Sequence, residues 1–468
     1  MFRCSAAAPG RSLAITLLVA FACVAAPRPS AAAGAWPDTW PDQWPEPAPV
    51  APGADGADFA PGDGLDALLR YAMRHSPALE ADYQRWRAAL QRVPQARSLP
   101  EPQLSLSLLI DEIDRSADYM GERYALSQAF PWFGKLALRG DMAVAEAQVE
   151  ARRFEATRLA LAERVTAAWF EYAWLHQAAE TANENRVLLA RLEGVARARY
   201  RVGEVSQADV NRAQVELGRI DEQWRSLRDR LLPAAAALNA VLGRPAHTRL
   251  PVPLAPSRQP LEALPEREPS EWLALARAGN PELAAGRHET EREAHGIELA
   301  RREYYPEFML GLEYERGGSG RMARMDGGGS DMVAGMVSFS VPIRRSRYDA
   351  GLAEARARHT AASRAVASRE FGLEAELQGA LFDYRDGVRK LELYGGTLLP
   401  KARQSLATTE AAYRTGEAGF ADLVDAQRVL LEFALAHERA AVDRALALAR
   451  INTLVGESPA SIERESRP

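Results

Sequence analysis

The side chains best placed for chemistry in this 468-residue chain are two carboxylates in its last quarter. Asp422 and Asp425 are three residues apart, a spacing that puts both on one face of a helix. Such a pair attracts cations. Acidic residues near a helix N-terminus also stabilise the helix dipole without any further role. Neither interpretation requires a catalysed reaction.

Methionine is a second group with donor chemistry, and five methionines fall within one short part of the chain. Their thioethers are soft ligands that suit monovalent copper or silver. The simpler alternative is that they face lipid or fill a loop. The five residues are Met309, Met322, Met325, Met332 and Met336.

Residue sets for catalysis are missing. The seven histidines are scattered, with His288 and His295 seven apart, and no HExxH or Cys/His ligand set occurs. GxSxG, P-loop and strand-turn-helix GxGxxG patterns are also missing. A net charge of -5, without a dense basic patch, argues against nucleic acid as a partner. We therefore expect no enzyme, no cofactor, no metal-ligand set and no nucleic-acid binding.

The N-terminus has the pattern of an export signal. Arg3 and Arg11 are followed by a short apolar run at 13–24 and by three alanines at 31–33 that suit cleavage. The only cysteines, Cys4 and Cys23, lie in this segment. Cleavage after the alanines removes both, whereas lipidation at Cys23 is an open alternative.

The part of the sequence that must position these groups is an internal duplication. Residues 200–204 (YRVGE) match 413–417 (YRTGE) at an offset of 213, and Asp209 meets Asp422 at the same offset. A period this long indicates a duplicated architecture. The predicted parts are a signal peptide at 1–33, a Pro/Trp-rich linker at 34–64, a first repeat at 65–250, a linker at 251–269, a second repeat at 270–458 and a tail at 459–468.

Each repeat is predicted to contain a helix, two strands, a very long helix, a glycine turn and a second helix. The leading helices are expected at about 65–97 and 271–304. The stretch 141–200 has no proline, and apolar residues in steps of four and three predict a coiled-coil seam. The seam residues are Leu161, Val165, Ala168, Tyr172, Leu175, Ala179 and Ala182 in the first repeat, and Leu373, Leu377, Ala380, Tyr384, Gly387, Leu391 and Tyr394 in the second.

The strands alternate apolar and polar residues, as in Leu104–Ile110, Phe308–Glu315 and Val333–Val341, with Pro131 and Pro342 ending the second strand of each pair. About ten residues of such alternation suit a membrane-spanning strand with one lipid face and one wet face. Polar segments at 111–121 and 317–330 are expected to be external loops. Four strands cannot close a barrel and open edges cannot lie in lipid, so several chains must share one barrel.

This pattern resembles the TolC-like outer-membrane factors over about 65–458. The duplication, the strand pairs between helices and the Tyr-x-x-Gly…Asp…Ala-Gln hairpin in both repeats carry the resemblance. The segment 127–135 (SQAFPWFGK) is similar to that of members serving heavy-metal pumps.

The resemblance implies an α+β membrane protein. It is a homotrimer with a long coiled-coil α-helical barrel in the periplasm and a shared transmembrane β-barrel, four strands per protomer, in the outer membrane of a Gram-negative bacterium. The expected function is the exit duct of a tripartite efflux system. The expected partners are a periplasmic adaptor, an inner-membrane pump of the RND type and outer-membrane lipid, with heavy-metal cations or drugs as substrates.

The resemblance also assigns sites. The two glycine turns are expected to contact the adaptor, unless they are plain helix-turn-helix connections; they comprise Val202, Gly203, Glu204, Val205, Thr415, Gly416, Glu417 and Ala418. Asp422 and Asp425 match an acidic ring at the closed periplasmic entrance, which in three copies would hold six carboxylates and favour cations. Asp209 and Tyr413 match a pair that latches neighbouring coils. A second latch is missing because Ala418 and Ala208 take its positions.

Two other functions stay open. A type I secretion duct belongs to the same class, and the lumen pattern does not separate it from an efflux duct. A periplasmic coiled-coil adaptor or scaffold belongs to another class, and the duplicated strand pairs argue against it.

Overall fold

The computed structural model describes residues 59–60, 62–109, 121–261, 263–316 and 331–457. The signal, the tail, most of the Pro/Trp-rich linker, nearly all of both predicted loops, and Met322 and Met325 lie outside these residues. Contacts divide the chain into a strand unit, which includes Ala89–Glu146 and Thr290–Ala361, and a helical unit, which includes Ala147–Glu289 and the described residues from Ala362 onward.

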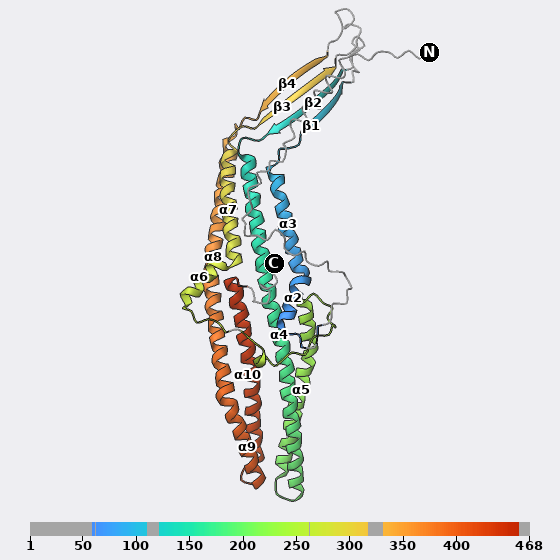
Figure 1. The fold of residues 1–468 in the computed structure, drawn as a ribbon, viewed down its shortest axis with the longest axis vertical. Helices are drawn as coiled ribbons and strands as arrows, with labels where there is room; N and C mark the ends of the chain where they lie inside the picture. The colour runs from blue at the N-terminus through green and yellow to red at the C-terminus, as the bar shows by residue number, and fades with distance from the viewer. Residues whose placement is uncertain (1–58, 61, 110–120, 262, 317–330, 458–468) are drawn as a thin grey trace, which may run out of the picture. The chain divides into compact units, whose positions relative to one another are not determined.

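The predicted order of elements occurs twice (Figure 1). The first repeat contains α2 (Leu65–His75), α3 (Pro77–Arg97), β1 (Gln103–Leu109), β2 (Gly121–Phe130), α4 (Lys135–Arg201) and α5 (Gln207–Val241). After the 3-10 turn η1 (Pro256–Arg258), the second repeat contains α6 (Pro269–Gly279), α7 (Pro281–Arg302), β3 (Phe308–Arg316), β4 (Met332–Phe339), α8 (Arg345–Leu393), the π-helical turn η2 (Tyr394–Leu398), α9 (Leu399–Thr415) and α10 (Phe420–Val455).

The prediction of one leading helix per repeat is wrong, because each is broken at an X-Pro step. Ser76 (ψ 116°) and Asn280 (ψ 119°) are extended. A following proline disfavours helical backbone at these positions. The Asn280 side chain then accepts a hydrogen bond from the Leu283 amide at 3.0 Å and caps the next helix.

The strand unit holds one antiparallel sheet in the order β1-β2-β3-β4. Its central pair, β2 with β3, joins the two repeats, with Leu126 opposite Leu312. The fourth strand ends at Phe339, short of the predicted Val341. Strands β1 and β4 are the edges, and each pairs with one neighbour among the described strands.

The strand-to-helix junction after β2 is held by charge. Lys135 is 1% exposed, and its ammonium donates to Glu303 at 3.1 Å and to Glu307 at 3.0 Å. Gly134 before it has φ +81°, a backbone state that glycine adopts without strain. The junction segment that the sequence singled out is therefore a fixed corner of the strand unit.

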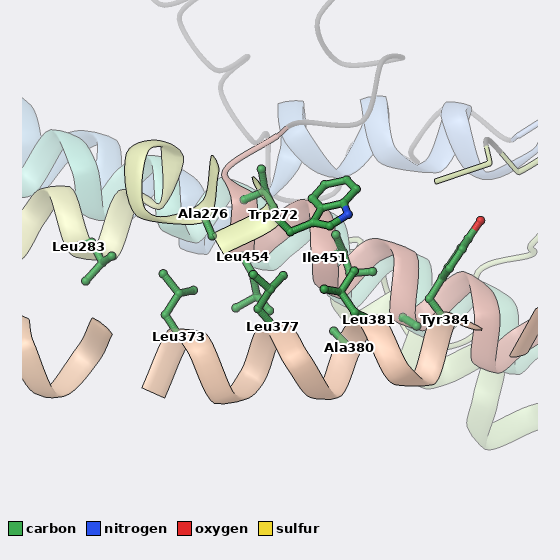
Figure 2. Packing of buried hydrophobic residues seen from close by; sticks show 12 residues of the cluster. Trp272, Ala276, Leu283, Leu373, Leu377, Ala380, Leu381, Tyr384, Ile451 and Leu454 are labelled. Carbon is green, nitrogen blue, oxygen red and sulfur yellow. The ribbon is translucent and has the colours of Figure 1, made fainter. Parts of the chain in front are cut away.

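The helical unit is packed along the predicted seams. Figure 2 shows one core, where Trp272 and Ala276 of α6, Leu377 and Leu381 of α8 and Ile451 of α10 point toward one another. Nearly all of the first-repeat seam is buried, although Ala168 is only partly so. The alanines allow close helix approach, as the heptad pattern predicted.

Within the part of the chain that the structure describes, no helix combines the length and apolar character needed to cross a membrane.

Candidate functional site

The turn between α4 and α5 is a compact cap with an exposed tip. Gly203 has φ +81°, and the amides of Gly203 and Glu204 donate to the carbonyls of Tyr200 (3.0 Å) and Arg199 (2.9 Å). These bonds satisfy carbonyls at the end of α4. Val202 is 70% exposed at the apex, so the turn presents an apolar side chain to solvent.

The turn between α9 and α10 repeats this geometry. Gly416 has φ +83°, and the Glu417 amide donates to the Ala412 carbonyl at 2.9 Å. Thr415 and Glu417 are exposed, and Ala418 is partly so. Both tips therefore satisfy the structural interpretation of a glycine-capped turn, and each still presents side chains outward.

The matched acids of the two repeats cap helices. Asp209 accepts from the Ser206 amide (3.2 Å) and hydroxyl (2.7 Å) at the start of α5. Asp422 accepts from the Gly419 amide at 2.9 Å at the start of α10. A capping role is thus real for both residues. The cap uses one oxygen of each carboxylate, and the negative charge of the side chain remains at the N-terminal end of the helix.

Asp425 differs from Asp422 because no cap engages it. Its side chain is 72% exposed, and its nearest cation is the Arg428 guanidinium at 3.5 Å. The structure brings both carboxylates into the first two turns of α10, close to the second tip. An exposed acid next to a capping acid can attract cations from solvent.

Tyr413 lies under this tip, 3% exposed, with its ring edge-on to Phe420 at a centroid distance of 5.8 Å. Burial raises the pKa of the Tyr413 hydroxyl, the Arg199 charge opposes this, and the Asp209 charge adds to it. The hydroxyl has no hydrogen-bond partner among the described residues. The Asp209 carboxylate bonds Ser206, and no hydrogen bond joins Asp209 to the Tyr413 hydroxyl within this single chain.

Arg199 is a residue that sequence reasoning missed. Its Nε donates to Glu204 at 2.8 Å, one Nη donates to the Tyr413 carbonyl at 2.5 Å, and the guanidinium lies 5.1 Å from the Tyr413 ring centroid. The Glu204 contact is the main reason that the pKa of Arg199 is raised. Arg199 connects the first tip to the second hairpin. The corresponding position of the second repeat is Ala412. This difference between the repeats is the one sequence feature that could have pointed to Arg199.

Glu216 was also missed. This carboxylate on α5 belongs to a residue that is 2% exposed, and it accepts from Arg219 at 2.5 Å and from Arg428 of α10 at 3.0 Å. The Arg428 hydrogen bond is the largest cause of a pKa lowered to about 2. Since 212 residues separate Glu216 from Arg428, no local sequence pattern predicts that they form a pair.

No group of three or more His, Cys, Asp or Glu side chains suited to a metal ion occurs within the described ranges. The candidate site consists of the two glycine-capped turns and the acidic residues in the first turns of α5 and α10.

Comparison with known proteins places this geometry among transport proteins. Residues 68–244 and 272–457 match the family described as outer membrane efflux protein, one match per repeat. Protein CyaE of Bordetella pertussis is 28% identical over 312 residues, which span 63% of this chain and 65% of CyaE, just under two thirds of that relative. Cobalt-zinc-cadmium resistance protein CzcC of Cupriavidus metallidurans is 22% identical over 340 residues, 73% of this chain and 77% of CzcC. The solved structure of the outer membrane protein VceC from Vibrio cholerae aligns with a TM-score of 0.70 at 19% identity, covering 84% of this chain and 96% of VceC.

Proposed function

The chain belongs to the outer membrane efflux protein family, as the resemblance of its duplicated hairpins predicted, and we propose that it is the passive exit duct of a tripartite system in the outer membrane. In this proposal an inner-membrane pump supplies the energy and a periplasmic adaptor connects the two. Because the CyaE match spans 65% of that relative, the activity, substrates and partners belong to the proposal.

The observation that carries the proposal is the sheet. Its register puts Leu104, Leu106 and Leu108 of β1 on one face with Leu126, Leu312 and Val337, and puts Ser127, Arg123 and Glu313 on the other. Leu104, Leu106 and Leu108 are 69%, 58% and 62% exposed in the single chain. An exposed apolar face opposite a polar one suits a wall between lipid and a wet lumen.

The edges of this sheet support a trimer. Strands β1 and β4 each have one unpaired side within the described sheet, and unpaired edges are unstable in lipid. Three copies of four strands would pair every edge in one barrel, and the α4/α5 and α9/α10 hairpins of three copies would form a helical barrel. Chemical cross-linking of the detergent-extracted protein should give a trimer. A monomer that keeps its fold would oppose the shared barrel.

For substrates we propose heavy-metal cations, in line with the similarity to CzcC, a cobalt-zinc-cadmium resistance protein. Asp422 and Asp425 would form the acidic ring of the periplasmic gate, with Tyr413 and Asp209 latching it across neighbouring chains. The unpartnered Tyr413 hydroxyl is the feature of the single chain that supports this latch. The two tips would contact the adaptor.

The test is conductance in planar bilayers with divalent cations titrated from the periplasmic side. We expect small cation-selective openings that divalents block. The double variant Asp422→Asn with Asp425→Asn should relieve the block, because asparagine keeps the cap but removes the charge. Asp443→Asn is the control, since it removes a partly exposed carboxylate from the same helix, 18 residues beyond Asp425 and outside the proposed gate. Openings that divalents block equally in the double variant would refute the gate, and a folded oligomer without openings would refute the duct.

A further inference from the structure

The two faces of the sheet differ in one unexpected way: the polar face contains methionines. In the register of β3 with β4, Met309 lies opposite Ser338, Met336 opposite Gly311, and Met332 opposite Glu315. Residues two apart on a strand share a face, so all three thioethers lie on the face of Ser127, Arg123 and Glu313. The sequence alone left these methionines open to a lipid-facing role, and the register puts them on the opposite face.

The three thioethers follow the strand direction. Their levels on β3 are 309, 311 and 315, a span of about 20 Å at the rise of a strand. Met309 and Met336 are diagonal neighbours across the β3–β4 pair, a separation that long side chains bridge. Met332 lies further along the same line, toward the far end of the two strands.

Gly311 makes room for this arrangement. A Cβ built at Gly311 would lie 3.1 Å from the Met336 Cε, so the thioether side chain lies over the glycine. Met336 and Met332 are nevertheless 44% and 55% exposed in the single chain. At these exposures much of each side chain stays in water, so burial contributes little at these positions.

The donors on this part of the face favour a soft cation over a hard one. Glu313 and Glu315 are both engaged by Arg123, whose nitrogens lie 2.7 Å and 3.4 Å from their oxygens. A hard divalent ion would have to displace that guanidinium. Thioether sulfur instead selects soft monovalent ions such as Cu⁺ and Ag⁺.

We propose that Met309 and Met336 form a binding station for a soft monovalent metal ion on the lumen face of the sheet, with Met332 as the next contact along the path. The inference rests on the proposed duct and names a substrate class for it. Two thioethers bind weakly, and weak successive contacts are what conduction requires, because an ion must leave as readily as it enters.

The test uses the full-length, detergent-solubilised protein and silver nitrate in chloride-free buffer. Equilibrium dialysis should show that Met309→Leu with Met336→Leu binds one Ag⁺ fewer per protomer than the unmodified protein. The matched control is Met73→Leu, which removes a thioether from α2 and should leave Ag⁺ binding unchanged. Gly311→Val keeps every sulfur atom but displaces Met336, and should weaken the same station.

Labelled methionine methyl groups supply a second readout. On Ag⁺ addition, the NMR signals of Met309 and Met336 should shift together, and Zn²⁺ at the same concentration should leave them in place. Equal Ag⁺ binding by the double variant, or an equal loss in Met73→Leu, would overturn the proposal. Bilayer conductance without silver separates the two ideas: a non-conducting protein whose Met309 and Met336 bind Ag⁺ refutes the duct but keeps the site.

Discussion

The two helical hairpins descend from one duplicated sequence, and they differ in continuity. Helix α4 of the first hairpin runs unbroken for 67 residues. The corresponding helix of the second is interrupted by the π-helical turn η2 between α8 and α9. Pro400, with no amide hydrogen, follows the turn, and Gly395 and Gly396 lie within it. The positions at the repeat offset in α4 are Val187, Ala182 and Asn183, which permit a regular helix.

The hairpins differ equally in charge. On α10, Arg428, Arg439 and Arg450 recur every 11 residues, which is three helical turns. Each has an acceptor on the first hairpin, namely Glu216, Glu171 and Glu163. Each also has an acidic neighbour in the second repeat, namely Asp425, Asp443 and Glu376. The positions at the repeat offset on α5 are Val215, Ser226 and Ala237, so α5 has no such row. The duplicated copies have become complementary: the first is continuous and acidic at the contact, and the second is interrupted and basic.

The largest expected effect comes from removing the buried acceptor. Glu216→Gln should lower the free energy of unfolding by about 1.5–3 kcal/mol, because it weakens charge-assisted bonds to two arginines. Glu171→Gln is the matched control: its side chain is 45% exposed, so its loss should cost about 0–1 kcal/mol. Denaturant unfolding in detergent measures both. Equal losses would mean that burial does not distinguish these contacts.

The same pair predicts a pH dependence. The pKa of Glu216 falls from 4.5 to about 2 in the folded chain. A lowered pKa means that the stabilisation is complete above pH 4.5 and is lost as the pH falls toward 2. Between those values the unmodified protein should lose more stability than Glu216→Gln does, and parallel curves would contradict the assignment.

A medium effect is expected at the interruption. Gly396→Ala should raise the free energy of unfolding by about 0.5–1 kcal/mol, because alanine is the better helix former and no atom lies within 4 Å of the added Cβ. Gly395→Ala should instead destabilise, since its Cβ would lie 2.9 Å from His437 Nε2. Thermal unfolding of the two variants compares neighbouring glycines directly. Stabilisation by both would show that η2 is not shaped by His437.

The smallest effect is expected at the tips. Arg199→Ala removes contacts with Glu204 and with the Tyr413 carbonyl, and ion pairs near the surface contribute little to global stability. Its signature should be local: faster amide hydrogen exchange at 202–205 and at 413–418, with little change in the unfolding midpoint. Exchange that rises only at the first tip would show that Arg199 does not join the hairpins.

Local patterns in the sequence determined much of this protein. Heptad steps predicted the long helices, alternation predicted the strands, and the paired YRxGE turns predicted the tips and, through the resemblance, the family that the match to both repeats confirms. The prolines that follow Ser76 and Asn280 signalled the two helix breaks. The prediction missed these breaks because it followed the helical periodicity around them. The assignments of gate, latch and adaptor contacts stay predictions.

Tertiary structure alone decided the contacts between distant segments. Arg199 with Tyr413, and Glu216 with Arg428, join residues 214 and 212 positions apart, where spacing along the chain contains no information about proximity. The register of β3 with β4 decided the face on which Met309 and Met336 lie, because a slip of one residue would turn every side chain of a strand to the other face.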